Sequence, residues 1–154
     1  MKNFVIKLFV GLVICLGVGG CTSQDENFIQ SVATVKTESA IVKQYIEDNS
    51  YIDVNIKKIS HKLAAPKGNE VLETDLLNLV KAAVYRFYSH VQKVDGIYVC
   101  SVDSAQDIHV SERVFNFLQQ DLAQMNKEIS SLKERGKDIT HLEIQEGYLN
   151  SLLE

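Results

Sequence analysis

The chain has 154 residues, of which 45% are hydrophobic and 23% are charged, and its formal net charge is −4. This mixture is typical of a folded protein, so composition excludes a disordered polypeptide, and the length suits one domain with its own core. Basic side chains form no cluster longer than Lys57 and Lys58, which excludes the electrostatic surface of a nucleic-acid-binding protein.

The N-terminal segment has the pattern of a targeting signal. Lys2 and Lys7 flank the start of an apolar run over residues 8–18. At about 11 residues, this run is shorter than the roughly 20 residues that a membrane-spanning helix needs, and it has the length of a signal-peptide core. The sequence therefore predicts export of the chain.

Four residues at the end of this run indicate a more specific signal. Val18, Gly19, Gly20 and Cys21 resemble the lipobox of bacterial lipoprotein precursors, which has an aliphatic residue three before the cysteine and small residues between them. The resemblance implies that diacylglycerol is attached to the Cys21 sulfur, that residues 1–20 are removed, and that an N-acyl chain is added to the cysteine. Ordinary secretion and a retained N-terminal helix are the alternatives.

Lipid attachment would decide how the domain meets a membrane. Loss of Lys2 and Lys7 from the 16 basic side chains leaves 14 against 20 acidic ones, so the processed chain has a charge near −6. An anionic membrane surface would repel such a domain. Membrane contact is therefore expected through the lipid alone, and no other cofactor is expected.

Residues 22–27 would form a short polar tether between the lipidated cysteine and a single globular domain over residues 28–154. At roughly 3.3 Å per extended residue, the tether reaches about 20 Å, so the domain would lie close to its membrane. In enterobacterial lipoproteins an aspartate after the cysteine retains the protein in the inner membrane. Thr22 stands at that position, so the resemblance implies the outer membrane, with its periplasmic or surface face left open.

The first part of the domain has helical periodicity. From residue 25 to about residue 48, apolar residues recur in steps of four and three, which predicts one helix with one buried side. Residues 50–65 fit either a strand or a helix. We favour the helix, because it accounts for more apolar positions and because Ser50 and Asp53 suit a capping box. The alternative is a strand over residues 51–59.

The next helix is predicted to be the centre of the core. It begins at Asn69 or Thr74 and continues to about Val91, with apolar residues on most of its circumference. Residues 93–96 suit a turn. The β-branched run at 97–102 is followed by a polar stretch and then a short apolar one, which predicts a hairpin from Ile97 to Val110.

A long helix follows the predicted hairpin. Ser111 suits its N-cap and Gly136 its C-terminal stop. Its apolar side narrows to a seam of Met125, Ile129 and Leu132, which another helix of the chain or another molecule could cover. The final segment, residues 139–153, is expected to hold a short helix near Tyr148.

These elements predict a mainly α fold, a compact domain of four or five helices with a small β-hairpin. The alternative is an α+β domain with the extra strand at 51–59.

Few residues suggest chemistry. Asp103, Asp107 and His109 could converge on a metal, but Asp and Ser in a turn more commonly bond to the local backbone. Cys100 beside His90 or His109 could imitate a thiol–imidazole pair, although an apolar setting raises the pKa of a thiol and makes it inert. We therefore predict no metal site and no enzyme. Cys100 is expected to be a small buried residue, with an intermolecular disulfide as the alternative.

The anchor and the absence of catalytic motifs together predict a membrane-anchored, non-catalytic module that binds or assembles another envelope protein, with its oligomeric state open. One alternative is a carrier or sensor of a small apolar ligand, with Tyr85, Tyr88 and Tyr98 lining its pocket. A periplasmic hydrolase is the second alternative, and its only support is the presence of scattered His, Asp and Ser residues.

Overall fold

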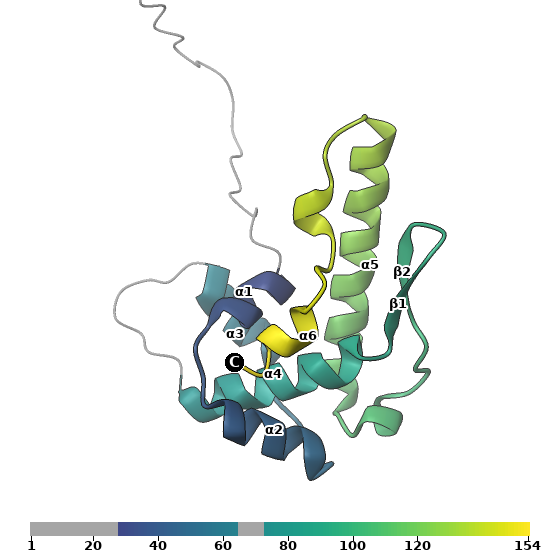
Figure 1. Ribbon diagram of the computed structural model, residues 1–154. Helices are drawn as coiled ribbons and strands as arrows, with labels where there is room; N and C mark the ends of the chain where they lie inside the picture. The colour runs from purple at the N-terminus through teal and green to yellow at the C-terminus, as the bar shows by residue number, and fades with distance from the viewer. Residues whose placement is uncertain (1–27, 65–72) are drawn as a thin grey trace, which may run out of the picture.

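The computed structural model describes residues 28–64 and 73–154. The predicted signal segment, the lipobox with Cys21, and the tether lie outside these residues. The described part is mostly helical with one two-stranded antiparallel hairpin (Figure 1), so the predicted fold class is confirmed. The elements are α1 (Phe28–Thr34), α2 (Ser39–Glu47), α3 (Ile56–Ala64), α4 (Thr74–Tyr88), β1 (Val91–Val94), β2 (Ile97–Cys100), η1 (Ala105–Ile108), α5 (Glu112–Glu134), η2 (Thr140–Leu142) and α6 (Tyr148–Ser151).

Helix α4 is the centre of the core, as its apolar circumference predicts. Ten of its fifteen residues are buried. Figure 1 shows α2 along one side of α4, α1 and α6 across the other, and α5 rising from the end where α4 meets the hairpin. Phe87 is fully buried and makes edge-to-face contacts with Tyr88 and Phe115, with ring centroids 5.2 and 5.9 Å apart.

The prediction of one helix from residue 25 to 48 is wrong, because the chain breaks between α1 and α2. Helix α2 begins after Glu38, whose carbonyl accepts hydrogen bonds from the backbone of Ile41 and Val42. The break lets the two helices pack in different places: α1 contacts α3, α4 and α6, whereas α2 packs along α4. A continuous helix could not bury both segments in this way.

The ambiguous stretch 50–65 divides into an extended part and a helix. Ile52 forms an isolated parallel bridge with Val110, and only from Ile56 does the chain become helical. The predicted capping box of Ser50 and Asp53 is therefore wrong. Asp53 instead accepts a hydrogen bond from Arg113 at 2.8 Å.

The hairpin begins earlier in the chain than predicted, at Val91 and not at Ile97. Strand β1 pairs with β2 through a two-residue turn at Asp95 and Gly96, whose φ angles of 50° and 85° lie in the left-handed region. Such turns match the twist of paired strands. The prediction that Ile97–Val102 pairs with Ile108–Val110 is wrong, since Val110 bridges Ile52.

The long helix and the final helix agree with their predictions. The Ser111 side chain accepts a hydrogen bond from the backbone of Val114 at 3.4 Å and so caps α5. The helix ends just before Gly136, which has a φ of 62°. After α5 the chain runs back beside it and ends in α6, which begins at Tyr148 (Figure 1).

Candidate binding site

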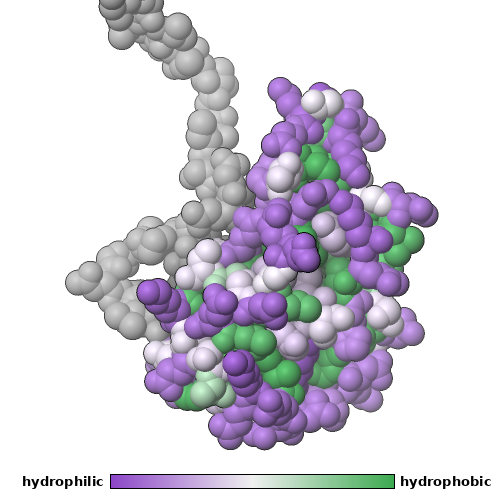
Figure 2. All heavy atoms as spheres, in the orientation of Figure 1, coloured by the Kyte–Doolittle hydropathy of each residue, from purple (hydrophilic) through white to green (hydrophobic). Residues whose placement is uncertain are grey.

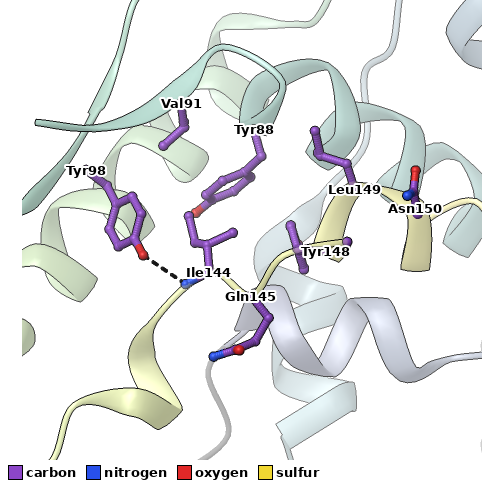
Figure 3. A pocket seen from close by; sticks show the side chains of 9 residues that line it. Tyr88, Val91, Tyr98, Ile144, Gln145, Tyr148, Leu149 and Asn150 are labelled. Atoms are coloured by element: carbon purple, nitrogen blue, oxygen red, sulfur yellow. Dashed lines mark hydrogen bonds between the residues drawn. The ribbon is translucent and has the colours of Figure 1, made fainter.

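A hollow of about 410 Å³ lies where the end of α4 meets the hairpin and the C-terminal segment. It is open to solvent, and none of the residues that line it is charged. Figure 3 shows Val91 and Tyr98 entering from the hairpin, Tyr88 from α4, and Leu149 from α6. The complete lining is Tyr88, Val91, Tyr98, Ile144, Gln145, Gly147, Tyr148, Leu149 and Asn150.

Two tyrosine rings form the inner wall of this hollow. Tyr88 is the last residue of α4, and Tyr148 is the first of α6; their centroids lie 5.9 Å apart in an edge-to-face arrangement. The Tyr88 hydroxyl donates a hydrogen bond to Asp121 at 3.2 Å, and the Tyr148 hydroxyl donates one to the Ile29 carbonyl at 3.1 Å. Both rings are therefore held by packing at the face and by a hydrogen bond at the tip.

Tyr98 holds the third side of the hollow together. Its hydroxyl accepts a hydrogen bond from the Ile144 backbone at 3.0 Å and so ties the loop before α6 to the hairpin. Lys93 reinforces this contact, because its ammonium lies 2.5 Å from the Glu143 carboxylate and 5.7 Å from the centre of the Tyr98 ring.

Burial shifts the pKa of three groups at the site. Burial raises the pKa of Tyr88 and of Tyr148, so both hydroxyls stay protonated at neutral pH. Burial also raises the pKa of Asp121 to about 6, against the hydrogen bond from Tyr88, which lowers it. Aromatic walls with hydroxyl and amide groups can hold an apolar group and orient it by hydrogen bonds.

The structure brings together two of the three tyrosines predicted to form a ligand pocket. Tyr88 and Tyr98 line the hollow, whereas Tyr85 does not and packs half-buried against the core elsewhere. The third aromatic wall is Tyr148, which sequence reasoning missed. It is the one aromatic residue of the last helix, which was a signal, but nothing in the sequence placed it beside Tyr88.

The predicted partner seam on α5 is internal. Met125 and Ile129 are 4% and 1% exposed, and Leu132 is partly buried against the same core. Strand β2 packs on α5, and the segment after it returns alongside (Figure 1). Of the two possibilities left open for this seam, the chain itself covers it and another molecule does not.

The weaker chemical candidates have structural explanations. The Asp107 carboxylate accepts hydrogen bonds from the Ser104 backbone at 3.2 Å and hydroxyl at 2.9 Å, and His109 ends this turn with a left-handed φ of 51°. Within residues 28–64 and 73–154, no three potential ligands approach closely enough to hold a metal. Burial raises the pKa of the half-buried Cys100 thiol, as expected for an inert cysteine.

Apolar side chains also reach the surface on the outer face of the hairpin. Val94, Ile97 and Val99 are 42%, 43% and 40% exposed. In Figure 2, hydrophobic residues interrupt the hydrophilic surface on the side where Figure 1 places the hairpin. This exposed face lies opposite the one that carries Tyr98.

No protein-family model, curated protein or solved structure matches this chain. Among the described helices, none is both long and apolar enough to cross a membrane.

Proposed function

We propose that this protein is a lipid-anchored lipoprotein of the bacterial cell envelope, positioned at the outer membrane, which binds another envelope protein and catalyses no reaction. The observation that carries the proposal is the sequence of Val18, Gly19, Gly20 and Cys21 after a short apolar run. The short tether would confine the domain to a layer next to the membrane, where its partners must also be present.

Two surfaces support a binding role. One is the tyrosine-lined hollow, and the other is the exposed apolar face of the hairpin. A second candidate function, a carrier or sensor of a small apolar ligand, draws support from the same hollow, since its volume lies in the range of small-molecule sites. The open side favours a ligand that is part of a larger molecule, because a free apolar ligand is held best where water is excluded.

The anchor can be tested by replacing the cysteine that would carry it. The full chain is expressed with an alkyne-tagged fatty acid, and its envelope fraction is analysed by mass spectrometry. We expect a chain that begins at Cys21 and carries diacylglycerol and an acyl group. Cys21→Ser should abolish labelling and membrane association, whereas Cys100→Ser, the matched control, should change neither.

The binding role can be tested in the same preparations. Proteins captured from detergent-solubilised envelope with the full chain should be lost with Cys21→Ser and retained with Cys100→Ser. An unprocessed, acyl-free chain in the soluble fraction would refute the anchor, and capture of no protein above background by the lipidated chain would refute the binding role.

A further inference from the structure

The two edges of the β1–β2 hairpin expose different backbone groups. In an antiparallel pair, residues that exchange hydrogen bonds alternate with residues whose backbone groups point away from the other strand. The Ser101 N–H donates to the His90 carbonyl at 2.9 Å, which sets this alternation along the register of the hairpin. The outward-facing groups are therefore those of Val91 and Lys93 in β1 and of Tyr98 and Cys100 in β2.

Side chains of α5 cover the β2 edge at Tyr98 and, beside it in the turn, at Gly96. Asn126 acts as a substitute strand, because its Oδ1 accepts from the Tyr98 N–H at 2.8 Å and its Nδ2 donates to the Tyr98 carbonyl at 2.7 Å. Lys133 donates to the Gly96 carbonyl at 3.2 Å. Proteins commonly cover a strand edge in this way, since unpaired backbone groups there recruit another strand.

The β1 edge is open. In the part of the chain that the structure describes, the outward backbone groups of Val91 and Lys93 have no hydrogen-bond partner, and the strand is exposed from Gln92 to Val94. This open edge borders the hollow, because Val91 belongs to both. A backbone that paired with β1 would therefore run along the mouth of the hollow.

We propose that the partner binds as an extended segment that pairs with the open edge of β1 and inserts an apolar side chain into the tyrosine-lined hollow. The inference rests on the proposed function and names its site. Strand addition of this kind takes its affinity from main-chain hydrogen bonds and its specificity from pockets that receive alternate side chains. The side chains between those would cover the outer face at Val94.

A second copy of the chain fits this edge poorly. Two β1 edges paired with each other would bring Val91 and Lys93 of the second copy to the hollow, yet Lys93 already pairs with Glu143 and Val91 already lines its own hollow. A four-residue edge also offers far less than the roughly 800 Å² per subunit that stable interfaces bury. A short segment of another protein needs no such area.

The charges around the hollow limit which partner segments could bind there. The hollow has no charged lining residue, so the inserted side chain should be apolar or aromatic. The loop beside it carries Glu143, paired with Lys93, and the exposed Glu146. Because the whole chain is acidic, residues that flank the inserted side chain should be basic or uncharged.

The proposal is tested with a phage-displayed library of random linear peptides, about 12 residues long, selected on the full chain in detergent. Peptides that are enriched are synthesised, and their affinity is measured by fluorescence anisotropy. We expect an apolar residue flanked by basic ones as the shared pattern. On binding, amide hydrogen exchange should slow at least tenfold at Val91 and Lys93, whose N–H groups would become paired.

Three variants distinguish the contribution of the β1 edge to peptide binding from that of the rest of the hairpin. Lys93→Pro removes one outward N–H at an edge position where proline is tolerated, and it should weaken peptide binding more than tenfold. Lys93→Ala keeps that N–H and should weaken binding less than threefold. Val99→Ser lies on the outer face of the other strand and should leave the affinity unchanged. Circular dichroism checks that each variant is folded.

Four outcomes would overturn the proposal. Selected peptides could protect amides elsewhere, or bind Lys93→Pro as well as they bind Lys93→Ala. Another is the enrichment of no peptide although the lipidated chain captures a partner, which would leave the proposed function standing. Finally, sedimentation could show a dimer whose β1 amides are protected without peptide. A chain without lipid on Cys21 would instead refute the anchor and leave the peptide result to be judged separately.

Discussion

Two opposite faces of helix α4 make different kinds of contact with the rest of the chain. Arg86 and Tyr88 lie about 200° apart around the helix axis. The Arg86 guanidinium donates to the carbonyls of Ser50 at 2.8 Å, His109 at 3.1 Å and Ile108 at 3.3 Å, and also to that of Tyr45. It thereby joins the end of α2, the extended segment after it and the turn before α5. The Tyr88 face opens into the hollow instead.

On the side of Tyr88, one buried charged group lacks a hydrogen-bond partner among the described residues. Lys81 lies about two turns before Tyr88 on the same face, and it is 1% exposed with no hydrogen-bond partner for its ammonium among the described residues. The side-chain amide of Asn78, which lies about 80° from both Arg86 and Tyr88 around the helix axis, is also buried and unpaired among the described residues. Both sides of α4 carry a buried polar atom without a partner among the described residues, the Arg86 Nε on one side and the Lys81 ammonium on the other. The comparison teaches that only the Arg86 side joins distant segments of the chain through several hydrogen bonds.

The largest expected effect comes from breaking the Arg86 face. Arg86→Met removes a donor from four carbonyls, of which that of His109 keeps the Ile52 N–H. Because a buried unpaired group costs about 1–3 kcal/mol, the free energy of unfolding should fall by about 3 kcal/mol. Arg86→Lys keeps the charge but lacks the fork of donors, and it should lose less. Urea unfolding followed by circular dichroism measures both. A loss below about 1 kcal/mol for the methionine variant would contradict this account.

Removing Lys81 should have the opposite sign. Lys81→Met replaces a buried, unpaired ammonium by an apolar chain, and the free energy of unfolding should rise by about 1–3 kcal/mol at pH 7. Burial lowers the pKa of Lys81, against Glu154, which raises it. The unfolded chain therefore binds more protons below pH 10.5, so wild-type stability recovers as the pH rises towards that value. The difference between variant and wild type should shrink accordingly.

The exposed Lys43→Met on α2 is the matched control for that measurement, and it should not stabilise the protein. Equal effects of the two substitutions would mean that burial of Lys81 is not the cause.

Asp121, which accepts the hydrogen bond from Tyr88, should give a pH dependence on the open face. Its folded pKa of about 6 lies above the ordinary value of 3.8. The stability that the protonated carboxyl contributes is therefore complete below pH 3.8 and is lost as the pH rises through about 6. Asp121→Asn should equal the wild type at pH 3.5 and exceed it by about 1–2 kcal/mol at pH 7.

Thermal unfolding from pH 3.5 to 7.5 measures this difference. Asp103→Asn, on the exposed turn, makes the same change in net charge and serves as control. Parallel curves for wild type and Asp121→Asn across the whole range would show that the carboxyl is not perturbed.

The smallest effect is expected at the rim of the hollow. Lys93→Ala removes an exposed ion pair with Glu143, and such pairs contribute little because water and salt screen them. Its unfolding midpoint in urea should match that of the wild type. A clear destabilisation would show that the loop before α6 depends on this contact more than on the hydrogen bond from Ile144 to Tyr98.

Sequence patterns identified the elements whose signals are local. The start of α5 at Ser111, its end before Gly136 and the buried circumference of α4 each follow from neighbouring residues. The pairing of strands does not follow from neighbouring residues. The short apolar run that ends at Val110 looks like a hairpin strand, but its true partner, Ile52, lies far away in the chain. No sequence pattern indicates a contact between residues that lie so far apart in the chain.

The residues of the candidate site also fall into those that the sequence could identify and those that it could not. Tyr88 and Tyr98 could be named from the sequence, because ten residues and one turn separate them. Tyr148 and Ile144 could not, because they reach the site through the return of the chain along α5. The same return buries Met125 and Ile129, so a periodic stripe that could have met a partner became internal core.

Sequence alone determined the helical class, the limits of the long helix and the lipobox resemblance, because periodicity, capping and short motifs are properties of adjacent residues. Only tertiary structure decided which apolar residues stay exposed, which strand edge stays open and which tyrosines share a hollow. The physical reason is that burial and hydrogen-bond pairing depend on what the rest of the chain brings alongside, and the residues of one segment do not specify their neighbours in space.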